Sequence, residues 1–562
     1  MEDREVLRSI LPFLPVKLES SSLVWPGPVI EALKALSRGP SHSRVDSGEV
    51  LFVAISDLRD SLSLSSRSLA FGTGHGYALF FDEFLSREQS TKWFAEVIPA
   101  MANLLLRFPT LLESHYQDVD SLLDGVETSL RLLEPQQAGI VILSQELIGA
   151  ILSCSFFCLF PTAQRGSKHL PMINFDLLFA SLYESYHENQ ESKIKCLIHY
   201  FERICLCMPS GFVSFERKLL SLKRIHPLVS YPYADFWGIS VVPLCQFEVR
   251  RSGLIEDHLG GALEVDFANK YLGGGALWKG CVQEEIRFMI NPELIAGMLF
   301  LPSMSDNEAI EIVGAERFSN YSGYASTFRF SGDYADRVKR DSIGRRITRI
   351  IAIDALCSPG LRQYKLDCLL REVNKAFCGF LDQSELWCYQ TQPQNKGFGH
   401  DGLENDNEDV NDTSESQSMF DGDDMVSSET IEANQLKDDL KDMQEGTSKS
   451  RAYHHGDVGV VTGNWGCGAF GGDPEVKMAI QWLAASQALR PFISYYTLGI
   501  AALENLDQVS QWILSHKWTV GDLWNLLVDY SSKRAKGETK LGFFSWLLPS
   551  LPHPRANVSN TL

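Results

Sequence analysis

The sequence predicts an α/β domain of three layers, preceded by an all-helical accessory domain. Two observations support this fold class. Before about residue 225, apolar residues recur at helical spacing between short breakers, whereas from about residue 235 short apolar strands alternate with helices. Such alternation is typical of a sheet that is covered by helices on both faces. At 562 residues, the chain is long enough for several domains.

Residues 1–230 are expected to form the helical accessory domain. Its clearest helix runs from Ser90 to Phe108, where we expect Pro99 to introduce a kink and Pro109 to end the helix. Residues 143–159 and 175–207 continue the helical pattern. We assign no chemistry to this part and expect it to buttress the second domain.

Residues 235–535 are expected to form the α/β domain, and residues 536–562 a C-terminal tail. The expected strands are residues 246–249, 263–267, 311–313, 349–355, 458–461 and 493–498. The expected helices are residues 283–290, 364–380, 473–489, 506–516 and 520–532.

An acidic segment at residues 391–449 interrupts this domain. Between Asp401 and Glu445 there are 16 acidic residues and two lysines, a net charge of −14, which leaves −6 of the total −20 for the rest of the chain. Such a composition cannot bury enough apolar area to offset chain entropy, so we expect a disordered insertion. The rest of the chain shows no basic face, and we expect no direct nucleic-acid binding.

Cysteine spacing and the chain terminus indicate an intracellular protein. Twelve cysteines are scattered without paired zinc spacing, which is typical of buried, reduced thiols. The acidic N-terminus lacks the basic start and apolar core of a signal peptide. The most apolar run, residues 139–160, is interrupted by Gln145 and Glu146, so we expect a buried helix and no membrane span. No His/Asp cluster points to a metal.

The stretch from Leu263 to Phe288 carries the strongest chemical signal. An alternating strand, residues 263–267, leads to the glycines Gly273–Gly275, and Gln283-Glu284-Glu285 then opens a helix. A strand, a glycine loop and a helix start make a phosphate cradle when the loop N–H groups are free. Taken alone, an acidic pair at a helix start is typical of simple dipole complementation.

A second glycine-rich element, residues 462–473, again lies between an expected strand and an expected helix. It offers a second set of N–H donors, and two cradles in one domain suit a diphosphate. Asp473 is also expected to be the N-cap residue of the helix that follows, which does not compete with phosphate binding.

Several motifs together resemble the poly(ADP-ribose) glycohydrolase family. The triple glycine, the Gln-Glu-Glu after a spacer, Val265–Asn269 before them and Ile286–Phe288 after them all match that family's signature. The resemblance implies a macrodomain-like fold with a mixed sheet between helices, and cleavage of ribose–ribose bonds that releases ADP-ribose. It further implies a role in the DNA damage response, in the nucleus and cytoplasm. The basic run at residues 337–346 is read as a solvated face or a nuclear signal.

The resemblance also implies the catalytic residues. Glu285 is expected to be the acid/base, Glu284 to position the ribose hydroxyls, and Asp266 to order the loop. Splitting an O-glycosidic bond needs a proton for the leaving oxygen, and adjacent glutamates cannot straddle a sugar as the paired acids of ordinary glycosidases do. One glutamate must therefore serve as acid and then as base. Two neighbouring carboxylates also disfavour double ionisation, which keeps one protonated near neutral pH.

By the same resemblance, further residues would contact the substrate. Asn269 would hold the ribose, Phe470 would pack against sugar and phosphate, and tyrosines would surround the adenosine. Leu498 stands where the family often places a phenylalanine against the adenine. The full set of expected binding residues is Ile255, Glu256, Asn269, Gly273, Gly274, Gly275, Gln283, Tyr321, Tyr324, Asn464, Gly468, Ala469, Phe470, Gly471 and Leu498.

Two other functions fit parts of the pattern. A macrodomain reader would bind ADP-ribose without cleaving it, but such a reader needs no acid pair beside the ribose. A nicotinamide dinucleotide enzyme needs a Gly-x-Gly-x-x-Gly turn, which the glycine pattern here does not provide. We therefore expect a monomeric hydrolase without cofactor or metal that acts on poly(ADP-ribose) chains of modified proteins.

Overall fold

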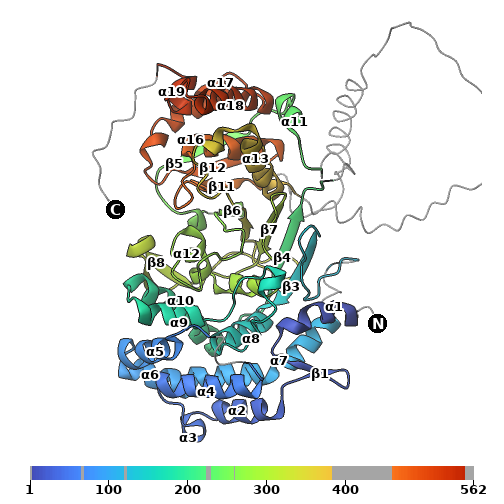
Figure 1. The fold of residues 1–562 in the computed structure, drawn as a ribbon, viewed down its shortest axis with the longest axis vertical. Helices are drawn as coiled ribbons and strands as arrows, with labels where there is room; N and C mark the ends of the chain where they lie inside the picture. The colour runs from blue at the N-terminus through green and yellow to red at the C-terminus, as the bar shows by residue number, and fades with distance from the viewer. Residues whose placement is uncertain are drawn as a thin grey trace, which may run out of the picture.

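A computed structural model describes residues 3–64, 69–118, 123, 125–222, 230–258, 260–382 and 458–550 (Figure 1). The expected acidic insertion at residues 391–449 lies outside the described residues.

An eight-stranded mixed sheet forms the centre of the molecule, with the strand order β3-β4-β7-β10-β6-β11-β12-β5. Five neighbouring strands, β10, β6, β11, β12 and β5, run parallel, and β7, β4 and β3 continue the sheet in antiparallel fashion. The strands are β3 (Gly139–Ser144), β4 (Phe212–Leu219), β5 (Gln246–Arg250), β6 (Leu263–Asp266), β7 (Glu308–Val313), β10 (Arg349–Ala352), β11 (Val460–Gly463) and β12 (Phe492–Tyr496). The predicted mixed sheet between helices is confirmed.

Two strands of this sheet come from the part of the chain expected to be all helical. β3 pairs with β4, and β4 pairs with β7 of the α/β part, so the sheet crosses the predicted boundary near residue 230. The helix expected at residues 143–159 is α8 (Gln145–Phe156), but the apolar run at residues 139–160, expected to be one buried helix, begins with β3. A short, uninterrupted apolar run does not distinguish a buried strand from a buried helix by its periodicity.

Helices cover both faces of the sheet. On one face, apolar residues of β6, β10 and β11 share a buried cluster with α13 (Leu366–Phe380), α16 (Pro474–Gln487) and α18 (Val520–Ala535). On the other, Ile310 and Ile312 of β7 pack in a cluster with α12 (Gln283–Ile290) and the 3-10 helix η8 (Pro292–Leu299). The remaining elements of this part are α11 (Ala234–Gly238), η7 (Ile255–Asp257), β8 (Ser319–Ser322), η9 (Ala325–Thr327), β9 (Arg329–Asp333), η10 (Gly360–Tyr364), η12 (Ala501–Leu503), α17 (Leu506–Ser515) and α19 (Phe543–Leu547).

The N-terminal part is a layered group of helices below the sheet in Figure 1. Its elements are α1 (Asp3–Ile10), η1 (Leu11–Phe13), β1 (Lys17–Glu19), β2 (Ser22–Val24), α2 (Gly27–Ser37), α3 (Pro40–Ser43), α4 (Gly48–Ser61), α5 (Thr73–Ala78), η3 (Leu79–Phe84), α6 (Arg87–Lys92), η4 (Trp93–Val97), α7 (Ile98–Asp118), η6 (Gly166–Lys168), α9 (Asp176–Glu184) and α10 (Glu188–Leu206).

Two details of this part differ from prediction. Pro109 does not end its helix, because α7 continues through it to Asp118. Packing compensates for the backbone bond that proline removes, since Phe108 and Leu112 on either side are fully buried. The helix expected at residues 175–207 is two helices, α9 and α10.

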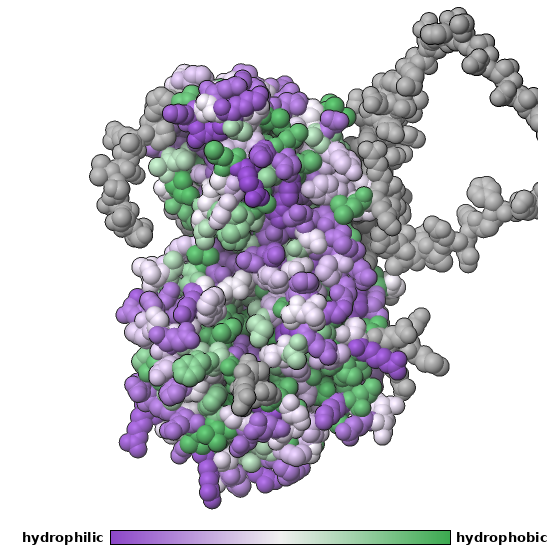
Figure 2. All heavy atoms as spheres, viewed as in Figure 1, coloured by the Kyte–Doolittle hydropathy of each residue, from purple (hydrophilic) through white to green (hydrophobic). Residues whose placement is uncertain are grey.

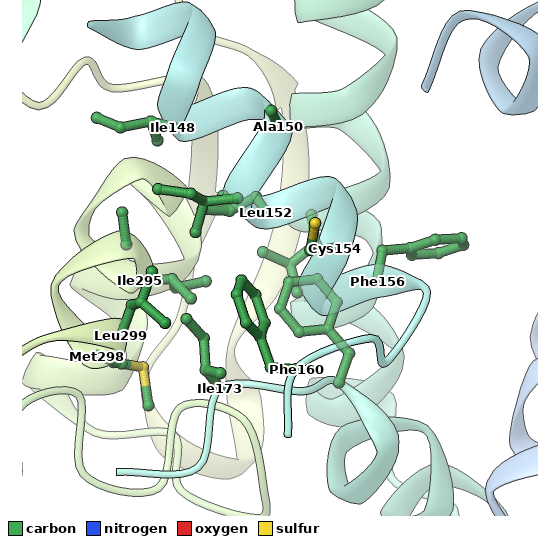
Figure 3. Packing of buried hydrophobic residues seen from close by; sticks show 14 of the residues in the cluster. Ile148, Ala150, Leu152, Cys154, Phe156, Phe160, Ile173, Ile295, Met298 and Leu299 are labelled. Carbon is green, nitrogen blue, oxygen red and sulfur yellow. The ribbon is translucent and has the colours of Figure 1, made fainter. Parts of the chain in front are cut away.

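One hydrophobic core joins the helical part to the sheet. Figure 3 shows α8 residues such as Leu152 facing Ile295 and Leu299 of η8. A buried polar contact accompanies this packing: Gln145 Nε2 of α8 donates to Glu293 Oε1 of η8 at 2.8 Å. Burial raises the pKa of Glu293 to about 8. The two parts are therefore parts of one packed body.

The prediction that residues 536–562 form a tail is wrong for the first half of this segment. α19 packs on α16 and α18, and its Phe543 and Phe544 are buried in the same cluster as those helices. The aromatic run Phe543-Phe544-Ser545-Trp546 is apolar enough to dock, which composition alone does not reveal when the segment is short.

Within the described residues, one helical stretch, Arg87–Gln117, has the length and apolar composition to cross a bilayer, and half of its most apolar window is buried. It packs against α2 and α8 as a core helix does.

Figure 2 shows hydrophilic residues gathered across the middle of the visible face, at the level of α12 in Figure 1.

We expect Leu152→Ala to lower the free energy of unfolding by about 2–5 kcal/mol, because it leaves a cavity between α8 and η8. The control is Leu206→Ala at the end of α10, whose side chain is 88% exposed; it should change the stability by roughly 0.5 kcal/mol or less. Denaturant unfolding followed by circular dichroism measures both variants. Equal effects would contradict a core shared by the two parts.

Candidate active site

The candidate site lies at the carboxyl ends of the parallel strands, where α/β sheets commonly bind ligands. The loop of residues 267–282 connects β6 to α12 and contains the triple glycine. The second glycine-rich loop follows β11, and Leu498 follows β12. Because β6, β11 and β12 are parallel neighbours, these three segments leave the sheet at the same edge.

Glu284 holds the first glycine loop with both carboxylate oxygens. Its Oε2 accepts the Asn269 N–H at 2.8 Å, and its Oε1 accepts the Gly273 N–H at 2.7 Å. The side chain is only 3% exposed. Glu284 therefore organises the loop, whereas its predicted contact with ribose hydroxyls stays a prediction.

Glu285 is bound in the same manner but is more open. Its Oε1 accepts the Gly275 N–H at 2.9 Å, and its Oε2 accepts the Val282 N–H at 2.8 Å, the second bond being half of a capping box. Its exposure, 7%, is about twice that of Glu284. Each oxygen keeps a second lone pair, so Glu285 can still meet a ligand.

The triple glycine does not offer free N–H groups, contrary to the expected phosphate cradle. Gly273 and Gly275 donate to the two glutamates, and Gly274 donates to the Tyr271 carbonyl at 2.9 Å. Glycine is needed here for space: a Cβ on Gly274, whose φ is +48°, would lie 2.6 Å from Glu284 Oε2 and 2.8 Å from Glu285 Oε1. This loop therefore holds carboxylates and provides no phosphate cradle.

Gln283 and Asn269 complete the loop's internal bonding. The Gln283 side chain bridges to the end of β6, accepting the Phe267 N–H at 2.8 Å and donating to the Val265 carbonyl at 3.1 Å. Asn269 Oδ1 accepts the Tyr271 N–H at 3.0 Å. Within the described ranges, Asn269 Nδ2 donates to no acceptor, so it is available to a ligand.

Asp266 is buried beside the acid pair and does not order the loop. Neither of its carboxylate oxygens has a hydrogen-bond partner in the part of the chain that the structure describes, so the predicted ordering role is wrong. Burial raises the pKa of Asp266 to about 7, while the Arg287 charge opposes and the Glu285 charge adds to that rise. Burial also raises the pKa of Glu284 well above its usual value, and repulsion from Asp266 and Glu285 adds to the shift. The cluster therefore retains a proton near neutral pH.

A buried ion pair lies beneath these acids. Arg287 on α12 contacts Glu264 on β6 at 2.6 Å, and both side chains are largely buried. The pair links helix to strand one turn beyond Glu284 and one residue before Val265. Arg287 lies in the Ile286–Phe288 motif that matched the family, but nothing in the neighbouring sequence indicated that Glu264 is its partner.

Lys193 of α10 also supports the loop, and the sequence analysis did not identify it. Its buried Nζ donates to the carbonyls of Trp278 and Gly280 at 2.6 Å each, and to that of Gly275 at 3.4 Å. Burial lowers the pKa of Lys193 to about 8. The helical part thus anchors the loop through its carbonyl groups, whereas the glutamates hold it through its N–H groups. A lone lysine on an apolar helix face is the only signal that sequence provided.

The second glycine-rich loop has free donors. Its N–H groups at Gly468, Ala469 and Phe470 meet no acceptor among the residues the structure describes, whereas its flanks are tied down. Asp473 caps α16 by accepting the Glu475 N–H at 3.0 Å, as predicted. The loop therefore has the geometry of an anion-binding site at a helix start. Gly471, with a φ of +71°, gives the loop its turn.

Other predicted binding residues form separate contacts around the edge. Ile255 packs with Val461 and Tyr496, and the Tyr321 hydroxyl donates to Glu256.

Both polar atoms of the Asn464 side chain form hydrogen bonds within the protein. Its Nδ2 donates to the Thr497 carbonyl at 3.0 Å, and its Oδ1 accepts the Tyr495 hydroxyl at 3.2 Å. Leu498 is exposed in the left-handed region with a φ of +51°. Its contact with an adenine stays a prediction.

Tyr324 lies near the start of α12, and its predicted contact with the adenosine stays a prediction. Burial raises the pKa of its hydroxyl, and a hydrogen bond with the Gln283 backbone opposes that rise while the Glu285 charge adds to it. The ring itself is half exposed. Among described residues, no group of three or more His, Cys, Asp or Glu side chains has the arrangement of a metal site.

The fold and the site define a macrodomain-type α/β protein with a buried acid pair on a glycine loop. Residues 234–505 match the poly(ADP-ribose) glycohydrolase macro domain fold, and residues 85–217 match the helical domain of the same family. The chain is 59% identical to poly(ADP-ribose) glycohydrolase 1 of Arabidopsis thaliana over 98% of both chains. It is 53% identical to that plant's probable poly(ADP-ribose) glycohydrolase 2, over 98% of this chain and 100% of the relative. A Caenorhabditis elegans poly(ADP-ribose) glycohydrolase 1 is 31% identical over 53% of this chain and 30% of its own length. The chain therefore belongs to the poly(ADP-ribose) glycohydrolase family, and the predicted resemblance is confirmed.

Asp266 makes the stability depend on pH in a defined direction. Its folded-state pKa of about 7 lies above the value of about 3.9 in an unfolded chain. Between these values the folded state binds more protons, so this group's contribution to the free energy of unfolding falls as pH rises from about 4 to 7. Asp266→Asn removes that loss, and its stability relative to wild type should increase between pH 4.5 and 7.5. Urea unfolding at both pH values, with the exposed Asp46→Asn as control, measures the change. A constant difference would contradict the assignment.

Proposed function

We propose that this protein hydrolyses the ribose–ribose O-glycosidic bonds of poly(ADP-ribose) and releases ADP-ribose, with Glu285 as the acid/base. Family membership supports the reaction class. The observation that carries the residue assignment is the pair of adjacent glutamates, of which Glu285 is the more exposed.

A single acid must perform both proton transfers. Both glutamates are held by backbone N–H groups of one loop, so they cannot take positions on opposite sides of a sugar as the two acids of ordinary glycosidases do. Glu285 donates its proton to the leaving ribose oxygen as the C–O bond breaks. The resulting carboxylate then takes a proton from the water that attacks the anomeric carbon, which restores the acid.

The buried carboxylates around Glu285 keep a proton available for this step. Asp266 and Glu284 both have raised pKa values because burial disfavours their charge. A carboxylate of this cluster that is ionised would stabilise the positive charge of an oxocarbenium-like transition state. The positive charge of Arg287, which is paired with Glu264, partly offsets the negative charge of the cluster.

The remainder of the substrate is proposed to cross the sheet edge. The free N–H groups after β11 suit the diphosphate, whereas the triple-glycine loop, expected from sequence as a further cradle, has no free donor to offer. Asn269 Nδ2 is available for the ribose beside Glu285. Leu498 and Ile255 then lie on the adenine side, following β12 and β5.

Glu285→Gln should reduce polymer cleavage by roughly 10²- to 10⁴-fold, because the amide cannot supply the proton. An amide nitrogen also cannot accept the N–H that one carboxylate oxygen now accepts, so a stability loss of about 1–3 kcal/mol is expected. Calorimetric binding of ADP-ribose checks that the site still forms. Glu284→Gln should weaken binding more, because its two bonds organise the loop, and the exposed Glu538→Gln is the control.

The outcomes separate enzyme from reader. Cleavage at the wild-type rate by Glu285→Gln would show that the acid is misassigned. Tight binding of ADP-ribose by wild type, without any release of ADP-ribose from polymer, would favour the reader.

Gly280→Ala should reduce turnover by more than about 10-fold. An added Cβ would lie 2.7 Å from Glu285 Cδ and 2.9 Å from Gly275 Cα. The loop cannot retreat, because Lys193 holds the Gly280 carbonyl, and a displaced acid loses its alignment with the substrate. Gly166→Ala is the control, because a Cβ there meets nothing within 4 Å. Wild-type turnover in Gly280→Ala would contradict the loop's role in positioning Glu285.

A further inference from the structure

Trp278 is an exposed tryptophan in the loop that holds the acids. Its side chain is 51% exposed, whereas Trp93, Trp237, Trp465, Trp482 and Trp524 are buried. Tryptophan is on average a strongly buried residue, so a half-exposed indole on a structured loop needs an explanation. Nothing in the proposed contacts with ADP-ribose uses it.

The backbone under this indole is rigidly held. Lys193 Nζ donates to the Trp278 carbonyl at 2.6 Å, and the Trp278 N–H donates to the Gly275 carbonyl at 2.9 Å. On the next residue, Gln190 Nε2 donates to the Lys279 carbonyl at 3.3 Å. An aromatic ring on a fixed backbone loses little conformational entropy when a ligand stacks on it.

The backbone that carries the indole lies close to the acid and on a defined side of it. Gly280, two residues further on, packs directly against the Glu285 carboxylate. Lys279 contacts Glu184 of α9 at 3.2 Å, and Lys193 and Gln190 belong to α10. Trp278 is thus on the side of the acids that faces the helical part. The second glycine-rich loop and Leu498 leave the sheet from β11 and β12.

This placement determines which group can reach the ring. If the diphosphate and adenine of the bound ADP-ribose extend over β11 and β12, the group beyond the scissile bond must leave in another direction. In poly(ADP-ribose), that leaving group is the adenosine ribose of the next unit, which carries a purine. The Lys279 ammonium lies 5.9 Å from the indole centroid and is paired with Glu184, so the ring offers the stacking surface there and the charge beside it is balanced.

We propose that Trp278 stacks on the purine of the leaving ADP-ribose unit and makes the site selective for polymer. This inference rests on the proposed function, because it uses the direction in which the substrate lies. The ring touches the leaving group and takes no part in proton transfer.

Two synthetic substrates with the same scissile bond isolate the purine. In one, ADP-ribose is joined through its anomeric carbon to the 2′-hydroxyl of AMP; in the other, it is joined to ribose 5-phosphate, which lacks the base. Trp278→Ala should lower kcat/KM for the AMP conjugate by roughly 5- to 150-fold, the range of base–aromatic stacking, and leave the base-free conjugate unchanged. Trp278→Phe should retain most of the activity. Tyr233→Ala, an aromatic residue 57% exposed beside α11, is the control.

Binding distinguishes failure of this inference from failure of the proposed function. With non-hydrolysable thioglycoside forms of both conjugates, calorimetry should show Trp278→Ala losing affinity for the AMP form alone, whether or not the protein cleaves it. Equal losses on both conjugates would assign the ring a structural role and overturn the proposal. Unchanged affinity and unchanged kcat/KM for both would overturn it as well. A wild type that binds but does not cleave would refute the hydrolase alone.

Discussion

Four hydrogen bonds from backbone N–H groups to Glu284 and Glu285 are the constraint on which the site depends. They satisfy two buried carboxylates that would otherwise be costly to remove from water. They also require that no side chain occupies the space at Gly274 and Gly280. The glycines are therefore needed for close approach of the backbone to the acids, and an anion has to bind elsewhere.

The helical part of the chain contacts the site in two ways, through a shared hydrophobic core and through hydrogen bonds from Lys193. Its core is continuous with that of the sheet through α8 and η8, so the helices cannot move independently of the site. Its Lys193 then reaches the glycine loop and donates to three of its carbonyl oxygens. One loop is thus held by carboxylates that accept from its N–H groups and by an ammonium that donates to its carbonyls. Such a loop can present both an acid and an exposed aromatic ring without internal freedom.

Burial determines the pKa shifts of the acidic residues in the site and distinguishes the positions of Glu284 and Glu285. Asp266 has no hydrogen-bond partner among the described residues, so desolvation controls its pKa and makes it hold a proton near neutral pH. Glu284 is deeper and serves the loop, while Glu285 combines two backbone bonds with an open side. Free N–H donors lie after β11, in a loop whose flanks are bonded and whose centre, among the described residues, is not.

Sequence alone determined the α/β class, the six predicted strands of the sheet near their observed positions, α12 from Gln283 to Ile290, and the family, because these depend on local periodicity and on one contiguous motif. Only tertiary structure decided which groups bond to one another. β3 joined the sheet because pairing with β4 decided the structure of an apolar run whose periodicity was ambiguous, and β4 in turn pairs with β7. The N–H groups of Gly273 and Gly275 donate to the glutamates, and Lys193 reaches the Trp278 carbonyl from 85 residues away in the chain. A hydrogen bond between distant segments leaves no periodic trace in either one, so spacing in the sequence cannot reveal it.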